Sequence, residues 1–293
     1  MGYKDPSPLV KELLLKDRIE YIEIIKDSED GIGSREVTER ILRPRGITSQ
    51  KEIKKENIKV NKRLRAFVDL GILISDEGEY NLSSLGYLLL DSWKSIGERV
   101  DTMDRFSDYF NNHLVNVIPK EFFRQIHKLR TSELTGIGIQ WKETLEEQMM
   151  NMERKLYNLT HCIHDYPEIV LEKAKNGEIE IVIVYQFEEY PELNYSDSEQ
   201  LREEELFNRL VDAGAEFRYL TLENRRPMGI RIVDEKWASF LLPKMLDGQL
   251  DRDQVFIGTD IEFVSWCRDL MYHIWSFEAE SLNVEEVIAE GEE

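Results

Sequence analysis

Apolar residues recur at helical intervals near the start of the chain and predict two short helices. The first pattern covers residues 9–25 and breaks at the polar stretch 27–31. The second covers residues 34–42, after which Pro44 and Gly46 interrupt it. We therefore expect two short helices that are separated by a turn.

A third helix is predicted around residues 53–68, and its two sides differ in character. At about 100° per residue, apolar side chains gather on one face and basic ones on the opposite face. The apolar face consists of Ile53, Val60, Leu64, Phe67 and Val68, and the opposite face contains Lys55, Lys59, Lys62 and Ala66. The basic side chains should therefore point away from the core.

The segment after this helix is predicted to form a hairpin. Gly71 is a natural helix stop, and two short apolar runs, 72–75 and 80–82, flank the polar turn 76–79. The order helix, helix, basic helix, hairpin is that of a winged helix-turn-helix.

Apolar residues next recur every three or four positions over 85–110 and predict one long helix. Such a helix fits a dimer-forming or spacer element. A helix that simply packs on the next domain fits the same pattern equally well.

From residue 141 onward, strand patterns alternate with helical patterns, which predicts an α/β domain with a largely parallel sheet. A last helix is expected from 260 to 277. The predicted strands cover 159–163, 178–185, 216–220, 229–233, 237–242 and 254–257.

Length and composition narrow the class of protein. The 293 residues suggest two domains at roughly 100 to 200 residues each, and 58 acidic against 38 basic residues give a formal charge of −20. No apolar run approaches the roughly 18 residues of a membrane span, and no signal-peptide core follows Met1. We therefore expect a cytoplasmic protein with no membrane partner. Two cysteines as far apart as Cys162 and Cys267 make no disulfide framework.

The charge is distributed unevenly along the chain. Residues 1–82 carry 16 basic and 16 acidic side chains, so the whole net charge of −20 lies in 83–293. Within the neutral part, residues 43–65 hold nine basic side chains against two acidic ones. An acidic body with one basic module is typical of a protein that contacts DNA through a single element. The alternative is a lysine-rich helix that is merely solvated.

Two stretches resemble prokaryotic winged-helix regulators: residues 64–73, at the exit of the basic helix, and residues 78–86, after the turn. The resemblance implies that the third helix enters the major groove of double-stranded DNA. Lys55, Lys59, Lys62, Arg63 and Arg65 would contact phosphates, and Asn57, Ile58 and Asn61 would read base edges. The acidic turn Asp76, Glu77 and Glu79 favours the alternative, a winged helix used for protein contacts. Because one neutral module binds DNA weakly, we expect a homodimer.

The segment 113–129 has the pattern H-L-x-x-x-I-P-x-x-F-x-x-x-I-x-x-L. This pattern resembles the junction segment of archaeal winged-helix regulators with a methanogenesis-regulator middle domain. Residues 258–275 and 227–234 resemble the phospholipase D-like sensor domain of such regulators. The resemblance places a catalytic H-x-K-x4-D motif at 227–234, where Asp234 is kept but Pro227 and Gly229 stand in place of histidine and lysine. A phosphodiesterase of this kind needs an imidazole nucleophile and a neighbouring cation. We therefore expect the fold without the enzymatic activity.

A sensor of this kind binds a small-molecule effector, and open α/β sheets bind ligands beyond the carboxyl ends of their strands. The candidate effector-binding residues are Tyr185, Phe187, Tyr190, Arg225, Arg226 and Asp234. The alternative is that the aromatic residues are ordinary core or edge packing and that the arginine pair is a solvated loop.

The run His161-Cys162-Ile163-His164 suggests a metal site, since imidazole and thiolate bind zinc, nickel or copper. In a strand, however, His161 and Cys162 point to opposite faces of the sheet. We therefore expect no metal, and we expect no cofactor.

The sequence thus predicts an α+β winged helix-turn-helix domain followed by an α/β phospholipase D-like sensor domain. The predicted divisions are a DNA-binding domain (1–86), a helical connector (87–140), a sensor domain (141–278) and a disordered acidic tail (279–293). The predicted function is that of a transcriptional regulator whose DNA binding is controlled by an effector. The alternatives are a phosphodiester- or nucleotide-processing enzyme and a protein-interaction module.

Overall fold

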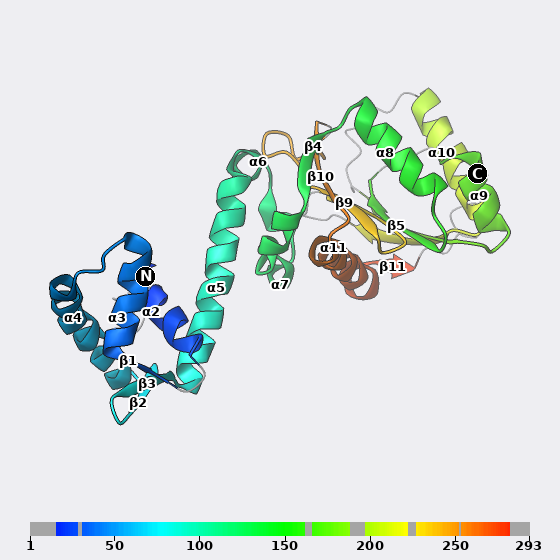
Figure 1. Cartoon of the computed structure of the whole chain (residues 1–293). Coiled ribbons are helices and arrows are strands. Elements are labelled where there is room, and N and C mark those ends of the chain that lie inside the picture. Colours follow the sequence, from blue (N-terminus) through cyan, green and yellow to red (C-terminus); the bar gives the residue numbers. More distant parts are fainter. Residues whose placement is uncertain are drawn as a thin grey trace, which may run out of the picture. The chain divides into compact units, whose positions relative to one another are not determined.

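The computed structural model describes residues 16–28, 31–161, 166–187, 197–221, 227–251 and 253–281. The chain forms two compact units, Met1–Glu98 and Arg99–Glu293 (Figure 1). Of the helices in the described segments, none has both the length and the apolar composition that a bilayer crossing requires.

The first unit is a small α+β module. Its sheet has the strand order β1-β3-β2, and both pairings are antiparallel. The elements are α2 (Lys16–Lys26), β1 (Ile32–Gly33), α3 (Ser34–Leu42), α4 (Gln50–Asp69), β2 (Leu73–Asp76), β3 (Glu79–Leu82) and the beginning of α5 (Ser84–Arg105). The predicted order of helix, helix, basic helix and hairpin is confirmed. The strand β1 was not predicted, because two residues are too short to show a periodicity.

The apolar face of α4 holds this unit together. Val60 and Leu64 are fully buried and Phe67 is 1% exposed, and all three belong to one core with residues of α2, α3 and the hairpin. Burying side chains of this size contributes roughly 1.5–3 kcal/mol each. The orientation of α4 about its own axis is therefore fixed by its apolar side.

A close contact joins the beginning of α5 to the sheet. Gly86 is buried, and a Cβ atom at this position would lie 2.3 Å from the carbonyl oxygen of Ile72. The hydroxyl of Ser83 accepts a hydrogen bond from the Gly86 N–H and lies 2.9 Å from the same carbonyl. The first turn of α5 can approach β2 this closely only because residue 86 has no side chain.

The second unit is built on one mixed sheet with the order β11-β7-β6-β5-β8-β9-β10-β4. The strands are β4 (Glu133–Gly136), β5 (Lys155–Thr160), β6 (Glu180–Phe187), β7 (Glu216–Thr221), β8 (Gly229–Val233), β9 (Trp237–Leu241), β10 (Gln254–Gly258) and β11 (Glu280–Ser281). Only β5, β6 and β7 run parallel among the described strands. The predicted largely parallel sheet is wrong for the other half, because β8 and β9 are joined by a tight turn with no crossover helix.

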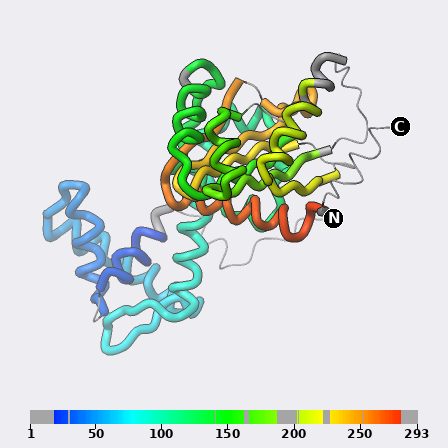
Figure 2. Tube along the Cα trace, turned by 90° about the vertical axis from the view of Figure 1, so that its right-hand side faces the viewer, coloured from blue at the N-terminus to red at the C-terminus, as the bar shows by residue number. Residues whose placement is uncertain are grey.

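Helices cover both faces of this sheet (Figures 1 and 2). One face packs against α8 (Ile139–Met150), α9 (Glu168–Lys175) and α10 (Asp197–Asp212). The other face packs against α11 (Ile261–His273) and the short helical segments between α5 and β4, which include α6 (Ser107–Asn112) and α7 (Lys120–Phe123). Alternate residues of each central strand therefore enter two different cores.

The boundary between the units differs from the predicted one. The sequence predicted a separate connector over 87–140, but the chain divides within α5, between Glu98 and Arg99. Apolar residues between Phe106 and Leu129, among them Tyr109, Ile118 and Phe122, are buried in the core of the second unit, and β4 pairs with β10 at the edge of its sheet. These residues have no core of their own, so they belong to the second unit.

The ordered structure at the end of the described chain extends beyond residue 279, where the sequence predicted the acidic tail to begin. After α11 the backbone continues through a π-helical turn, Ile274–Glu278, and β11 then pairs with β7. Glu280 and Ser281 thus belong to the sheet and not to the predicted acidic tail, and residues 282–293 lie outside the described residues.

The contact at Gly86 yields a test of this fold. Replacing Gly86 with Ala should lower the free energy of unfolding of the first unit by about 1–3 kcal/mol, because the new methyl group overlaps backbone. Chemical denaturation followed by circular dichroism measures the change. Gly97→Ala in the same helix is the matched control: nothing lies within 4 Å of its Cβ position, so it should be neutral or stabilise by up to about 1 kcal/mol. Equal effects of the two substitutions would contradict the close contact.

Candidate nucleic-acid interface and ligand cavity

The face of α4 opposite the core is open to solvent and basic. Lys55, Lys59, Lys62 and Arg65 are exposed, and Ile58, in their midst, is 70% exposed. Lys59 forms an ion pair of 2.8 Å with Glu56, in which both groups remain accessible. Exposed pairs of this kind contribute little and exchange readily. The predicted orientation of the basic face is confirmed.

Asn57 and Asn61 are tied to the scaffold through their amide oxygens. The hydroxyl of Thr38 lies 3.1 Å from Asn57 Oδ1 and 2.7 Å from the Ser34 carbonyl oxygen, and the hydroxyl of Tyr80 donates to Asn61 Oδ1 at 3.1 Å. Both asparagines are half-buried. Their amide nitrogens can still donate, whereas an asparagine that binds adenine through two hydrogen bonds needs both its oxygen and its nitrogen.

Arg63 differs from the other predicted phosphate-binding residues. Its guanidinium donates to the hydroxyl of Tyr21 at 2.7 Å and lies over the same ring, 5.5 Å from its centroid. The side chain therefore fixes α4 against α2 and is not on the exposed basic face.

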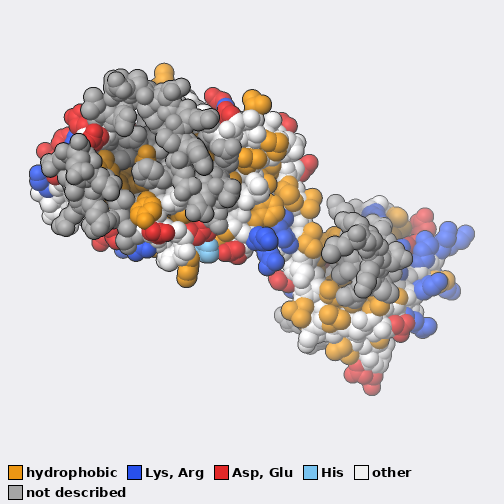
Figure 3. Space-filling view, turned by 180° about the vertical axis from the view of Figure 1, so that it is seen from behind, with side chains coloured by type: hydrophobic (Ala, Val, Ile, Leu, Met, Phe, Trp, Pro, Cys, Tyr) orange, Lys and Arg blue, Asp and Glu red, His pale blue; other side chains and the backbone are white. Residues whose placement is uncertain are grey.

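The hairpin has the opposite charge. β2 and β3 are joined by a two-residue turn in which Glu77 and Gly78 have positive φ angles of 45° and 90°. Asp76, Glu77 and Glu79 are all exposed there. In the first unit, Figure 3 shows Lys and Arg side chains gathered on one side and acidic side chains at the lower tip.

The predicted effector-binding residues do not form one group in the described chain. Tyr185 lies half-buried on β6, Phe187 ends the same strand with a side chain that is not described, and Tyr190, Arg225 and Arg226 lie outside the described residues.

The carboxylate of Asp234 binds backbone N–H groups and stabilises the fold. It lies in the turn between β8 and β9 with a φ of 53°, and its carboxylate accepts hydrogen bonds from the backbone N–H groups of Glu153, Arg154 and Lys155 at 2.8–2.9 Å. The side chain thereby fixes the entry to β5. It does not line the cavity described next.

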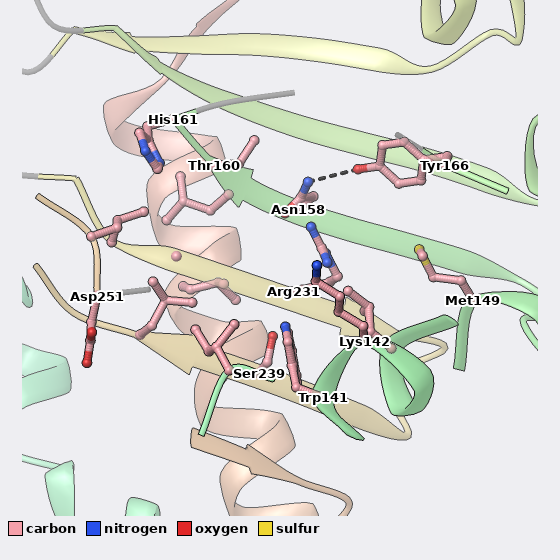
Figure 4. Close-up of a pocket in the computed structure, with 17 residues that line it drawn as sticks. Trp141, Lys142, Met149, Asn158, Thr160, His161, Tyr166, Arg231, Ser239 and Asp251 are labelled. Carbon is pink, nitrogen blue, oxygen red and sulfur yellow. Dashed lines mark hydrogen bonds between the residues drawn. The ribbon is translucent and has the colours of Figure 1, made fainter. Parts of the chain in front are cut away.

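A cavity of about 690 Å³ lies on the face of the sheet that α8 covers (Figure 4). Three polar residues from adjacent strands line its floor, because Arg231 pairs in register with Asn158 on β5 and with Ser239 on β9. The remaining lining residues are Ile137, Trp141, Lys142, Leu145, Met149, Leu159, Thr160, His161, Tyr166, Gly229, Ile230, Leu241, Leu250 and Asp251.

The polar groups of the cavity are well ordered by their neighbours. The Asn158 amide donates to the hydroxyl of Tyr166 at 2.8 Å, and both residues are buried. Trp141, from the first turn of α8, stacks on Trp237 with ring centroids 5.7 Å apart. The Arg231 side chain is 8% exposed and lies in Figure 4 between Asn158 and Trp141.

Asp251 connects the cavity wall to the segment after α6. One carboxylate oxygen lies 3.0 Å from His113 Nε2, and the other accepts from the N–H of Asp253. Lys244 Nζ is 3.3 Å from Asp251 and also bonds Asp253, and these two carboxylates raise the pKa of the Lys244 ammonium. The cavity's carboxylate is therefore already bound by His113 and Lys244.

The degenerate motif lies beside this cavity. Gly229, where the resemblance places lysine, lines it, and a Cβ atom at this position would lie 2.8 Å from Cγ of Leu241. The neighbouring strand has thus closed the space that a longer side chain would need.

The predicted absence of a metal stays a prediction. His161 lies at the cavity, but Cys162 and His164 lie outside the described residues. Within the described segments, no three His, Cys, Asp or Glu side chains gather where they could hold a metal ion. Burial raises the pKa of the Cys267 thiol, which keeps it protonated and a poor ligand.

The cavity residues carry a sequence signal that was missed. β8 reads Gly-Ile-Arg-Ile-Val, and all five positions are buried. An arginine inside a buried strand, and likewise Asn158 inside β5, is uncommon unless it serves a site or a partner. Polar residues inside buried strands therefore indicated the position of the cavity better than the aromatic residues that follow a strand.

No protein-family model matches the chain, and no curated protein matches it. Among solved structures, TrmBL2, an archaeal chromatin protein with a novel mode of DNA binding, is 12% identical, with a TM-score of 0.37 over 77% of this chain and 83% of its own. NucT from Helicobacter pylori is 10% identical, with a TM-score of 0.36 over 52% of this chain and 98% of its own. Nuc, a phospholipase D family member from Salmonella typhimurium, is 9% identical, with a TM-score of 0.37 over 52% and 97%. Similarities at these TM-scores carry no conclusion about this chain.

The bonds of Asp234 give a testable distinction between a structural and a ligand-binding role. Asp234→Ala should lower the free energy of unfolding by about 2 kcal/mol, because three N–H groups lose their acceptor and a residue with a Cβ remains at positive φ. Asp234→Asn should be milder, because asparagine tolerates this φ and keeps one acceptor oxygen. Thermal denaturation measures both. An alanine variant as stable as the parent would contradict the structural role.

Proposed function

We propose that the chain is a DNA-binding transcriptional regulator in the cytoplasm whose second unit binds a small-molecule effector. The first unit would be a winged helix-turn-helix, with α3 and α4 as the two helices, α4 as the recognition helix and the β2–β3 hairpin as the wing. The observation that carries this proposal is the exposed basic face of α4, held outward by its buried apolar face.

The contacts to DNA divide into two kinds. Lys55, Lys59, Lys62 and Arg65 would bind phosphates, which gives affinity without sequence preference. Ile58 is placed to contact a thymine methyl group, and the amide nitrogens of Asn57 and Asn61 can donate to base acceptors. Arg63 would act indirectly, by holding α4 against Tyr21.

The acidic hairpin constrains how DNA approaches. Asp76, Glu77 and Glu79 would repel a phosphate backbone, so the tip of the wing should stay clear of the duplex. Most of the contact surface would then come from α4. A small contact surface favours a protein that binds as a dimer.

A row of exposed apolar residues along α5 supports a homodimer. Leu88 is 67% exposed, Ile96 46%, Val100 53% and Met103 42%. At about 100° per residue these side chains share one side of the helix. We assign this row to a helix-to-helix contact between two copies, which would carry two recognition helices.

The cavity in the second unit is the candidate effector site. It is lined by buried polar residues within apolar walls, which is the usual composition of small-molecule sites. The resemblance places the motif residues at Pro227 and Gly229, which offer neither nucleophile nor cation, so the proposed role is binding without hydrolysis. An effector that binds one arrangement of the dimer better would change operator affinity.

The DNA contact is tested by reversing charge on α4. The double variant Lys55→Glu, Lys62→Glu should reduce affinity for random duplex DNA by at least about tenfold and lower the slope of log affinity against log salt by about two. Fluorescence anisotropy at several salt concentrations measures both quantities. The matched control is Lys120→Glu, Lys175→Glu, which makes the same change of charge at exposed positions of the second unit. Equal losses in the two variants, or no loss in the first, would remove α4 from the interface.

The dimer is tested on α5. Replacing Ile96 and Val100 with Lys should give a monomer by light scattering, because two charges would enter the proposed contact. Tyr87→Lys is the control, since Tyr87 is 53% exposed but lies on the other side of the helix. A parent protein that is monomeric at micromolar concentration would overturn this part of the proposal.

A further inference from the structure

We propose that the cavity binds an organic anion, a carboxylate or phosphate group carried on an apolar body, with the acid group held by Lys142, Arg231, Ser239 and Trp141. This inference rests on the proposed role of the cavity as the effector site and names the class of ligand.

Three hydrogen-bond donors of the cavity have no partner among the described residues: the Lys142 ammonium, the Trp141 indole N–H and the Ser239 hydroxyl. Ser239 is 2% exposed and Trp141 9% exposed, so these two side chains are largely buried, whereas Lys142 is exposed to solvent. Ammonium and indole groups can only donate, and a buried donor gains most from a charged acceptor. The cavity therefore favours a ligand group that accepts hydrogen bonds and donates none.

Arg231 adds a permanent positive charge to the same wall. Its guanidinium cannot be deprotonated, and it is flanked in register by Asn158 and Ser239. Figure 4 shows Arg231, Lys142 and Trp141 close together on one side of the cavity, with Ser239 beside Trp141. A planar guanidinium and a nearby ammonium are well suited to an oxyanion.

The first turn of α8 adds to the positive electrostatic potential on this side of the cavity. The helix has Gly138 at its N-cap with no side-chain capping bond and no acidic residue in its first turn. Its free N–H groups carry partial positive charge next to Trp141 and Lys142. Asp251, on another part of the wall, already binds His113 and Lys244.

The rest of the wall sets the body of the ligand. Ile137, Leu145, Met149, Leu241 and Leu250 are apolar and leave room in a cavity of about 690 Å³, within the usual range of small-molecule sites. A neutral polyol would place hydroxyl groups against these side chains without partners. An aromatic or aliphatic acid would satisfy both parts of the cavity.

The test uses two probes with the same apolar body, 1-naphthaleneacetate and its neutral amide 1-naphthaleneacetamide, titrated calorimetrically into the full chain. The acid should bind at least about tenfold more tightly than the amide. Lys142→Gln and Ser239→Ala should each weaken the acid severalfold and the amide less, because the amide carries no charge, and Arg231→Gln should weaken the acid most. Lys175→Gln is the control for loss of an exposed cation and should have no effect.

Equal affinities for acid and amide, or no binding of the acid at millimolar concentration, would overturn the proposal. Because Lys142 is exposed, its variant should fold even where Arg231→Gln does not. DNA affinity of the parent protein separates the two proposals. A parent that binds DNA but not the acid rejects only the anion, and a parent that binds the acid but not DNA rejects only the regulator.

Discussion

The burial of one side of α4 is the constraint on which the first unit depends. Val60, Leu64 and Phe67 can be covered by α2, α3 and the hairpin in only one rotation of the helix about its axis. That rotation leaves Lys55, Lys59 and Lys62 in solvent. The whole formal charge of −20 lies in residues 83–293, so this basic face belongs to a part of the chain that has no net charge. The proposed affinity for DNA is thus a consequence of how an apolar core is filled.

Sequence periodicity predicted the elements that repeat a pattern over many residues. The second and third helices and the hairpin of the first unit, the end of its first helix, and the strand 229–233 were predicted close to their observed bounds, whereas the predicted start of the first helix at residue 9 lies outside the described residues. Periodicity did not predict strands that are too short to show a pattern. It also did not predict strand direction, which depends on how the strands pair. β1 has two residues, β4 is an edge strand with mixed burial, and strand direction depends on connections that hydrophobicity does not encode.

The candidate sites likewise contain a part that local sequence patterns predict and a part that depends on contacts between distant residues. The exposed lysines of α4 follow from helical geometry and were predicted one by one, but the tie between Arg63 and Tyr21 joins residues 42 positions apart and leaves no local signal. The cavity combines α8 with β5, β8 and β9, and β5 lies next to β8 in the sheet although β6 and β7 come between them in the chain. Asp234 was kept at the expected place in the motif, yet its bonds show that an aspartate can fix a turn there without a catalytic partner.

The contacts of His113 bear on the charge of the cavity wall that contains Asp251. Its Nδ1 lies 2.6 Å from the carbonyl oxygen of Tyr109, which can only accept, so this nitrogen carries a proton. A second proton must then lie between Nε2 and the carboxylate 3.0 Å away. Whichever atom holds it, as imidazolium with carboxylate or as neutral ring with carboxylic acid, the pair sums to zero. Among the described residues, the pair of His113 and Asp251 therefore adds no net charge to the cavity, and the guanidinium of Arg231 and the ammonium of Lys142 add positive charge.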